Sequence, residues 1–337
     1  MSKSTYFMKR FALDLMRNFG LFACARVMSG SRARILMYHN FSGPGHIGGD
    51  AVNTVDLRRQ LAYLRRHFEV VPLASIFERL KTGAPFHRLT VALTIDDGRR
   101  NCYEFLFPLL KEFGFPATFF VVSSFIRRED WIWTDKVLWL SERPSRPTEL
   151  SAGNIDRLFA NLSRLRPETR NAVIESMAKR MNQQLPREAP SQYAPCDWNE
   201  LREMADSGLV EIGSHTVTHP IFSSLTEEES WHELTLSRAQ IEDGMSRPVR
   251  CFCFPNGKPA DYRLGQLQQV RDAGYAGAVV AHPGLVTNKA DPFELPRLGV
   301  SGGSDKLSFS KDLDGVEHYQ TKLLKSLRVR RDGSSGW

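Results

Sequence analysis

Short, uninterrupted apolar segments alternate with amphipathic segments along most of this 337-residue chain. Strands that are buried on both faces read as continuous apolar runs, and they occur in parallel sheets covered by helices. We therefore predict a parallel α/β sheet or barrel. Its strands are expected at 34–39, 70–73, 89–95, 117–122, 210–213, 249–254 and 276–280.

Amphipathic segments between these runs predict the covering helices. Leu57, Leu61 and Leu64 recur at helical spacing. Thr54, just before them, is of a residue type that caps helices. The next helix is expected to end at Gly83. Further helices are predicted at 102–113, with Gly114 as the stop, and at 198–207, 226–245 and 262–273.

The alternation is interrupted from about 127 to 195, where several prolines and a polar helical stretch near 154–182 occur. We interpret 127–195, called the insertion below, as a helical insertion or lid within one domain at 31–302. Residues 1–30 are predicted to form an amphipathic leader helix. Residues 303–337 are predicted to form a polar, basic tail.

The composition is that of a folded chain, with 42% hydrophobic and 25% charged residues. The net charge of +7 favours anionic partners in general. The basic residues lack the aromatic interleaving of a nucleic-acid-binding module, so no nucleic acid is expected as a partner. Five cysteines without framework spacing favour a reducing compartment, and Cys251 and Cys253 should share one strand face.

The N-terminal stretch mixes basic and apolar residues. Asp14 and Arg17 interrupt the apolar core that a signal peptide needs, and no run approaches the roughly 20 apolar residues of a spanning helix. We therefore expect a cytoplasmic protein. An apolar series recurs at helical spacing, so this helix either lies peripherally at the inner membrane face or packs on the domain. The series is Phe11, Leu15, Phe19 and Phe22.

Two polar clusters directly follow predicted strands: Asp96 with Asp97, and His215 with His219. Ligand sites in such folds lie at the carboxyl ends of the strands, so the two clusters should meet. One carboxylate and two imidazoles are a common ligand set for a catalytic Zn²⁺ that keeps one position open. A second carboxylate beside the first could act as a base.

Each cluster alone has a simpler explanation. Asp-Asp-Gly after a strand can be a turn. Two histidines four residues apart can lie on a helix or at the surface, and the Glu of the helical zinc-protease motif is absent here. The flanking Gly213-Ser214 and Pro220 favour a loop. The occurrence of both clusters after strands favours a site, and His39 ends a further strand.

This combination resembles the polysaccharide deacetylase family, or NodB-homology domain, over about 34–300. The first family motif appears as Thr94-Ile95-Asp96-Asp97-Gly98, and the second as His215-Thr216-Val217-Thr218-His219. Segment 252–257 is similar to the third family motif. The resemblance implies a distorted (β/α)7-type barrel, here with a helical insertion, that hydrolyses the N-acetyl group of an aminosugar.

The resemblance also implies roles by position. Asp97, His215 and His219 would hold one divalent metal ion, with Zn²⁺ preferred and Co²⁺ or Ni²⁺ as alternatives. Asp96 would be the general base. A backbone N–H near Asn256 would help to stabilise the oxyanion.

The sequence departs from the family pattern in two roles. Cys253 stands where many members have the Arg that fixes the base, and Arg297 is the predicted substitute. The block that supplies a general acid in many members has no match. His39 and His282 are the available substitutes, and either could instead be a buried, hydrogen-bonded histidine.

We therefore expect a metal-dependent hydrolase that removes the N-acetyl group from an N-acetylhexosamine of a polysaccharide or lipid-linked glycan, in exopolysaccharide or cell-envelope glycan biosynthesis. One alternative is removal of another small acyl group, such as formyl. Another is a non-catalytic glycan-binding member of the fold. Trp131, Trp133 and Trp139 either stack on sugar rings or pack the core of the insertion.

Overall fold

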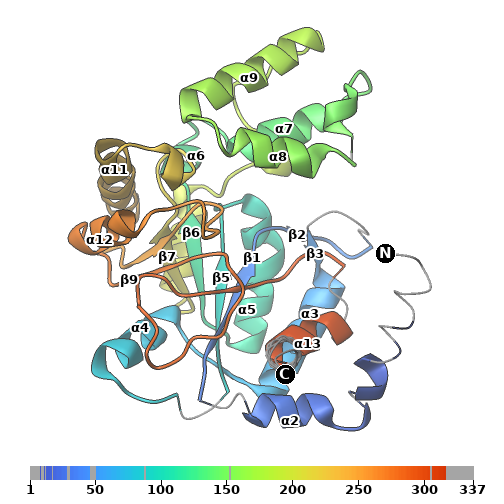
Figure 1. The fold of residues 1–337 in the computed structure, drawn as a ribbon, viewed down its shortest axis with the longest axis vertical. Helices are drawn as coiled ribbons and strands as arrows, with labels where there is room; N and C mark the ends of the chain where they lie inside the picture. Colours follow the sequence, from blue (N-terminus) through green and yellow to red (C-terminus); the bar gives the residue numbers. More distant parts are fainter. Residues whose placement is uncertain are drawn as a thin grey trace, which may run out of the picture.

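A parallel sheet surrounded by helices forms the centre of the molecule (Figure 1). The computed structural model describes residues 8, 11, 13–16, 18–28, 31–45, 51–86, 89–151, 153–303 and 306–315. Neighbouring strands follow the order β10-β1-β5-β6-β7-β8-β9. The strands are β1 (Arg34–Tyr38), β4 (Glu69–Val70), β5 (Thr90–Ile95), β6 (Ala117–Val121), β7 (Val210–Ser214), β8 (Cys251–Cys253), β9 (Gly277–Val279) and β10 (Leu298–Gly299), with β2 (Phe41–Ser42) and β3 (Val52–Asn53) paired separately.

The sheet curves into a parallel half-barrel, which confirms the predicted barrel-type α/β fold. β4 pairs with the first half of β5 and β6 with its second half, so both contact the same strand. A bridge between Val279 and Leu295 brings the segment before β10 beside β9. The two ends of the strand order therefore approach each other. This curvature gathers the carboxyl ends of the strands at one mouth.

The covering helices follow the sequence pattern with two differences. The cap of α3 (Thr54–His67) is Asn53, not Thr54, because the Asn53 side chain accepts from the Val55 and Asp56 N–H groups. The segment predicted as one helix at 102–113 begins with a short π-helix, because Pro108 has no N–H to donate to the carbonyl four residues earlier. The remaining helices around the sheet are α2 (Leu21–Met28), α4 (Leu73–Thr82), η1 (Cys102–Leu106), α5 (Phe107–Phe113), α6 (Ser123–Ile126), α10 (Trp198–Asp206), η4 (Phe222–Ser224), α11 (Glu227–Met245), α12 (Leu264–Asp272) and α13 (Lys306–Leu313).

The two faces of the sheet are packed by alternate residues. Cys251 and Cys253 lie in one apolar cluster with Phe120, whereas Phe252 belongs to the larger cluster under the helices. The prediction that the two cysteines share a strand face is therefore confirmed. Both faces of the strands are therefore packed, and a site built on packed elements is held more precisely than one built on loops.

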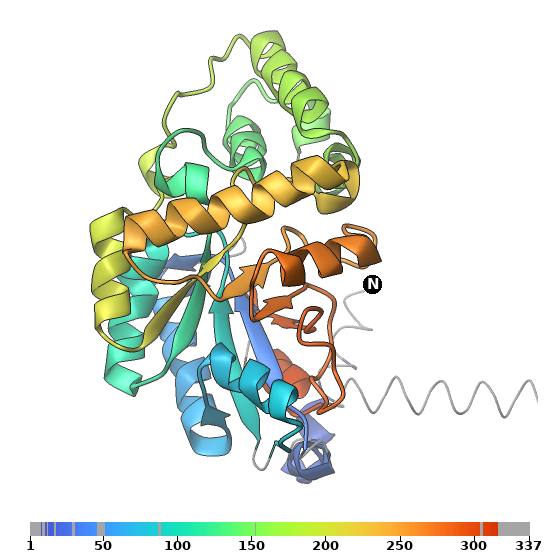
Figure 2. The ribbon, with the colours of Figure 1, turned by 90° about the vertical axis from the view of Figure 1, so that its left-hand side faces the viewer.

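The insertion stands beyond the end of the sheet at which β6 and β7 end (Figures 1 and 2). Its tryptophans Trp131, Trp133 and Trp139 are all buried in a separate apolar cluster. The polar helix expected near 154–182 is two helices, because Pro167 begins the second one. The elements are α7 (Trp133–Ser141), η2 (Thr148–Leu150), α8 (Ile155–Leu162), α9 (Pro167–Arg180) and η3 (Ser191–Tyr193).

The predicted leader helix is interrupted by a turn at 19–20, where Gly20 has a φ of 76°, and only part of its apolar series contacts the domain. Phe22 is buried against Leu307. Phe11 and Phe19 are 70% and 77% exposed. Among the helices of the described residues, none is long and apolar enough to cross a bilayer. The first part of the predicted polar tail instead forms helix α13, in which Leu307, Phe309 and Leu313 are buried, and 316–337 lies outside the described residues.

Candidate active site

The structure brings the three predicted metal ligands together at the mouth of the half-barrel. The Asp97 Oδ1 atom lies 3.7 Å from His215 Nε2 and 3.6 Å from His219 Nε2. All three side chains are buried, and their ligand atoms lie within 4.8 Å of one another. Asp97 follows β5, and the histidines follow β7, two strands away in the sheet order. We call these three residues the metal cluster.

Neighbouring groups orient the metal cluster. His215 Nδ1 lies 2.8 Å from the Cys253 carbonyl oxygen, which turns Nε2 toward Asp97. The other Asp97 oxygen, Oδ2, accepts a 2.9 Å hydrogen bond from Arg99 Nη2. Asp97 Oδ1 is thereby left facing the two imidazoles.

The ionisation of the cluster fits a divalent cation. Burial lowers the pKa of His219 to about 3, and it also lowers the pKa of His215. Burial alone would raise the pKa of Asp97, but the Arg99 guanidinium and the imidazoles hold this pKa well below its usual value. One carboxylate and two neutral imidazoles are the forms that bind a metal. His219 Nε2 is the ring nitrogen that faces Asp97, whereas its Nδ1 is buried without a hydrogen-bond partner.

Arg297 holds Asp96 in a two-pronged ion pair. The distances from Nη1 to Oδ1 and from Nη2 to Oδ2 are both 2.7 Å. Arg297 is itself fixed, because its Nε donates to the Val280 carbonyl and its Nη1 to the Thr94 hydroxyl. Burial raises the pKa of Asp96, and the Arg297 charge outweighs that effect, so the pKa is lowered. Arg297 thus lies beside Asp96, where it was predicted to lie.

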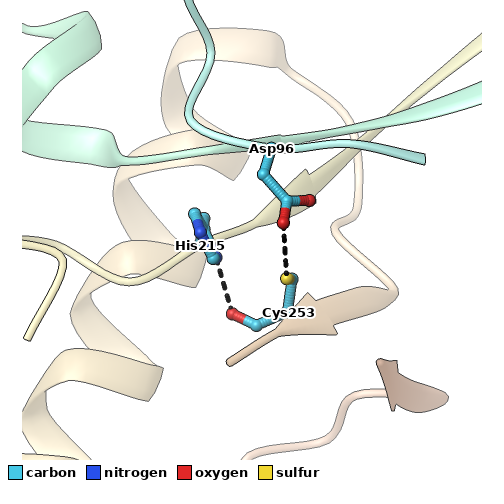
Figure 3. A group of neighbouring side chains, drawn as sticks. All are labelled: Asp96, His215 and Cys253. Atoms are coloured by element: carbon cyan, nitrogen blue, oxygen red, sulfur yellow. Dashed lines mark hydrogen bonds between the residues drawn. The ribbon is translucent and has the colours of Figure 1, made fainter. Parts of the chain in front are cut away.

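Asp96, His215 and Cys253 form a second group of metal-ligating atom types (Figure 3). The Cys253 thiol points at Asp96 Oδ2, 3.6 Å away, and lies 3.1 Å from Arg297 Nη2. Burial raises the pKa of Cys253, so it stays a neutral thiol. Because Arg297 already engages both oxygens of Asp96, we interpret Cys253 and His215 in this group as neighbours that help to hold Asp96 in place.

The other predicted site residues are placed differently. His39 Nε2 lies 3.7 Å from Asp96 Oδ2, with 40% of its side chain exposed. The His282 ring instead faces Glu294, at 4.0 Å. The Asn256 side chain donates to Asp261, which leaves only its backbone for the predicted oxyanion role. That role stays a prediction.

The backbone at the site is strained. Asp97, Thr216, His219 and Asn256 have φ values of 79°, 74°, 56° and 59°, a region that side-chain-bearing residues rarely adopt. Such strain persists only where surrounding contacts impose it. Here the Glu233 carboxylate accepts hydrogen bonds from the backbone N–H groups of residues 217 and 218, at 2.6 and 3.1 Å.

Sequence reasoning missed three residues that support the cluster. Arg99 contacts Asp97 and also donates to Asp135 Oδ2, which is fully buried in α7. Glu233 supports the histidine loop from α11. Arg99 directly follows the Asp-Asp-Gly motif, and that adjacency was an available signal. No signal in the sequence pointed to Asp135 or Glu233, because only the fold brings α7 and α11 beside the metal cluster.

Comparisons with known proteins agree with this geometry. The family model for polysaccharide deacetylase matches residues 83–278, more than half of the chain. The chain is 28% identical over 167 residues to the poly-beta-1,6-N-acetyl-D-glucosamine N-deacetylase of Escherichia coli K12, a match that covers 49% of this chain and 18% of that protein. The chain therefore spans less than a fifth of that curated relative.

Solved structures share the fold at low sequence identity. The Streptococcus pyogenes deacetylase PplD in complex with acetate superposes with a TM-score of 0.58 and 16% identity, over 84% of this chain and 99% of that one. IcaB from Ammonifex degensii superposes with a TM-score of 0.56 and 17% identity, over 84% of this chain and 98% of that one. These likenesses establish the half-barrel fold.

Proposed function

The chain belongs to the polysaccharide deacetylase family, and from this we propose that it is a metal-dependent hydrolase that removes the N-acetyl group from an N-acetylhexosamine of a glycan. One observation carries the proposal: the metal cluster lies directly beside the ion-paired Asp96. The donor set of one carboxylate and two imidazoles supports Zn²⁺ first, with Co²⁺ and Ni²⁺ as alternatives.

Asp97, His215 and His219 would hold the cation. When bound, a divalent cation supplies Lewis acidity, which makes water a better proton donor and polarises a carbonyl group. That help matters here because the Arg297 pair keeps Asp96 ionised but only weakly basic.

The chain's own residues would then move the protons. As a water oxygen bonds to the amide carbon, Asp96 accepts the proton that the water loses. The C–N bond breaks next, and the leaving nitrogen needs a proton. His39 is the candidate donor, because its ring lies beside Asp96 and is open to solvent. The products are acetate and the free aminosugar.

For the substrate, we propose an exopolysaccharide or cell-envelope glycan built of N-acetylglucosamine. The E. coli relative is named as a poly-beta-1,6-N-acetyl-D-glucosamine N-deacetylase, which supports this class of substrate. Oligomers of β-1,6-linked N-acetylglucosamine are therefore the first substrates to test. A lipid-linked intermediate is the alternative carrier of the same sugar.

We also propose peripheral contact with the cytoplasmic face of a membrane through the N-terminal helix. Its support is the exposure of Phe11 and Phe19 on a chain of net charge +7. Sedimentation with anionic phospholipid vesicles should be reduced by a double Phe11→Ser, Phe19→Ser substitution. Equal sedimentation of both proteins would contradict the proposal.

The test of the enzymatic proposal is acetate release from β-1,6-linked N-acetylglucosamine oligomers. Chelator-stripped protein should be inactive, and stoichiometric Zn²⁺, Co²⁺ or Ni²⁺ should restore release. Formate release from N-formyl analogues without acetate release would favour the alternative that the enzyme removes another small acyl group. If no acylated sugar is hydrolysed with any metal, the enzymatic proposal fails and glycan binding without turnover remains.

A further inference from the structure

A cavity of about 530 Å³ lies where the insertion meets α11. Its wall is formed by the loop before α7, the first turn of α9, the first turns of α11, and Thr218 beside the metal cluster. Ligand pockets in proteins measure about 300–1,000 Å³. The space, called the insertion cavity below, therefore has the size of a ligand site.

Arg170 gives the insertion cavity buried donors without partners. Its side chain is 1% exposed, and its Nε and Nη1 atoms have no hydrogen-bond partner. Within the described part of the chain it forms no ion pair. The guanidinium carbon lies 4.6 Å from the centre of the Trp133 ring, and Trp133 Nε1 is likewise unpartnered. Buried donors are normally satisfied, so this cluster is suited to ligand oxygens.

The charges around the cavity narrow the class of ligand. Several carboxylates share the wall with Arg170, so a fully anionic ligand would be repelled. A cation would meet the buried guanidinium. A neutral molecule rich in hydroxyl groups satisfies both, because hydroxyls donate to carboxylates and accept from arginine. The acidic wall residues are Asp130, Glu168, Glu228, Glu229 and Glu233.

The aromatic wall adds a shape requirement. Trp131 and Trp133 both line the cavity, and each leaves a small part of its surface, 4% and 5%, exposed beside the polar groups. Ligand sites combine such surfaces with a few placed polar groups. A pyranose ring presents apolar C–H faces and a rim of hydroxyls, which matches this wall.

We infer that the insertion cavity binds a sugar unit of the glycan other than the one that is deacetylated. The inference rests on the proposed function and deepens it. The cavity adjoins the metal cluster, because Thr218 lines it and directly precedes His219. Glu233 joins the two places, since it lines the cavity and holds the backbone of residues 217 and 218. A chain lying across both would be anchored at two points.

The test measures kcat/KM for acetate release from β-1,6-linked N-acetylglucosamine oligomers of one to six units. Wild-type kcat/KM should rise with length. In Arg170→Met the deficit should grow with length and reach about tenfold or more, the effect of losing one hydrogen bond from a charged donor. Asn171→Trp, which fills the cavity from a half-exposed position, should act alike. Arg180→Met, exposed at the other end of α9, is the matched control.

The same loss at every length in both cavity variants, or full retention of the length effect, would overturn the inference. Titration calorimetry of the hexamer against the wild-type protein and the variants separates it from the proposed function. Hexamer binding that weakens in both cavity variants but not in Arg180→Met supports the cavity even if no acetate is released. Absence of hexamer binding to the wild type overturns it, whatever the activity.

Discussion

The strand ends of the half-barrel and the insertion both bury charged groups, but they complete them differently. Asp96 is paired with Arg297 across the fold, and Asp97 is paired with Arg99, two residues further along the chain. In the insertion, Arg170 and Trp133 keep donors without partners.

This difference suggests a division of labour. Groups that perform chemistry must be held in place before the substrate arrives, so their partners come from the protein. Groups that recognise a substrate can leave their last hydrogen bonds to it. Under our two proposals, the strand ends would carry out the reaction and the insertion would recognise the glycan.

The largest effect should come from Asp96→Asn at the strand ends. The amide cannot accept the proton, so kcat should fall by about 10²–10⁴-fold. Metal content, measured by elemental analysis, should stay near that of the wild type because Asp96 is not in the metal cluster. A variant with full turnover would remove Asp96 from the role of base.

Arg297→Met tests how much the strand ends depend on their internal partners. Removing one member of a buried ion pair leaves Asp96 unpaired, so the free energy of unfolding should fall by about 3–5 kcal/mol. Arg271→Met is the control, because Arg271 pairs with Asp291 at the surface and should cost at most about 1 kcal/mol. Urea titrations measure the free energy of unfolding of both variants. Equal losses in the two variants would show that the strand ends do not depend on the buried Arg297–Asp96 pair.

Asp135→Asn tests whether the insertion also supports the metal cluster. Without Asp135, Arg99 loses a partner and leaves an unbalanced positive charge beside Asp97. Metal affinity should fall about 10- to 100-fold, as for other outer partners of metal ligands. Competition with a chromophoric chelator measures it, with Glu129→Gln, at an exposed surface pair, as the control. If the metal affinity of Asp135→Asn is unchanged, the insertion does not support the metal cluster.

The smallest effect concerns pH. His219 has a pKa of about 3 in the fold, below the ordinary 6.5, so unfolding takes up a proton between these values. Stability is full above about pH 6.5 and is lost as pH falls toward 3. Metal-free protein should be about 1–2 kcal/mol less stable at pH 5.5 than at pH 8. In urea titrations, the free energy of unfolding of His219→Gln should depend less on pH than that of the wild type. The same pH dependence in both proteins would show that His219 is not the group responsible.

Much of this protein follows from local sequence signals. Continuous apolar runs gave the strands, and their alternation with amphipathic segments gave a parallel sheet, because each strand is covered on both faces. The carboxyl ends of the strands in such a sheet meet at one mouth. For this reason the sequence alone was enough to predict that Asp97, His215 and His219 lie together. Arg297 could be proposed for the same reason.

Tertiary structure alone decided the rest. The partners Asp135 and Glu233 come from helices whose sequences carry no sign of the metal cluster. The insertion cavity arises where α9 meets α11, and no spacing rule links Arg170 to Thr218. Local patterns report what each segment does with its own neighbours, whereas pairing between distant helices depends on how their surfaces pack. That packing is decided only when the whole chain folds.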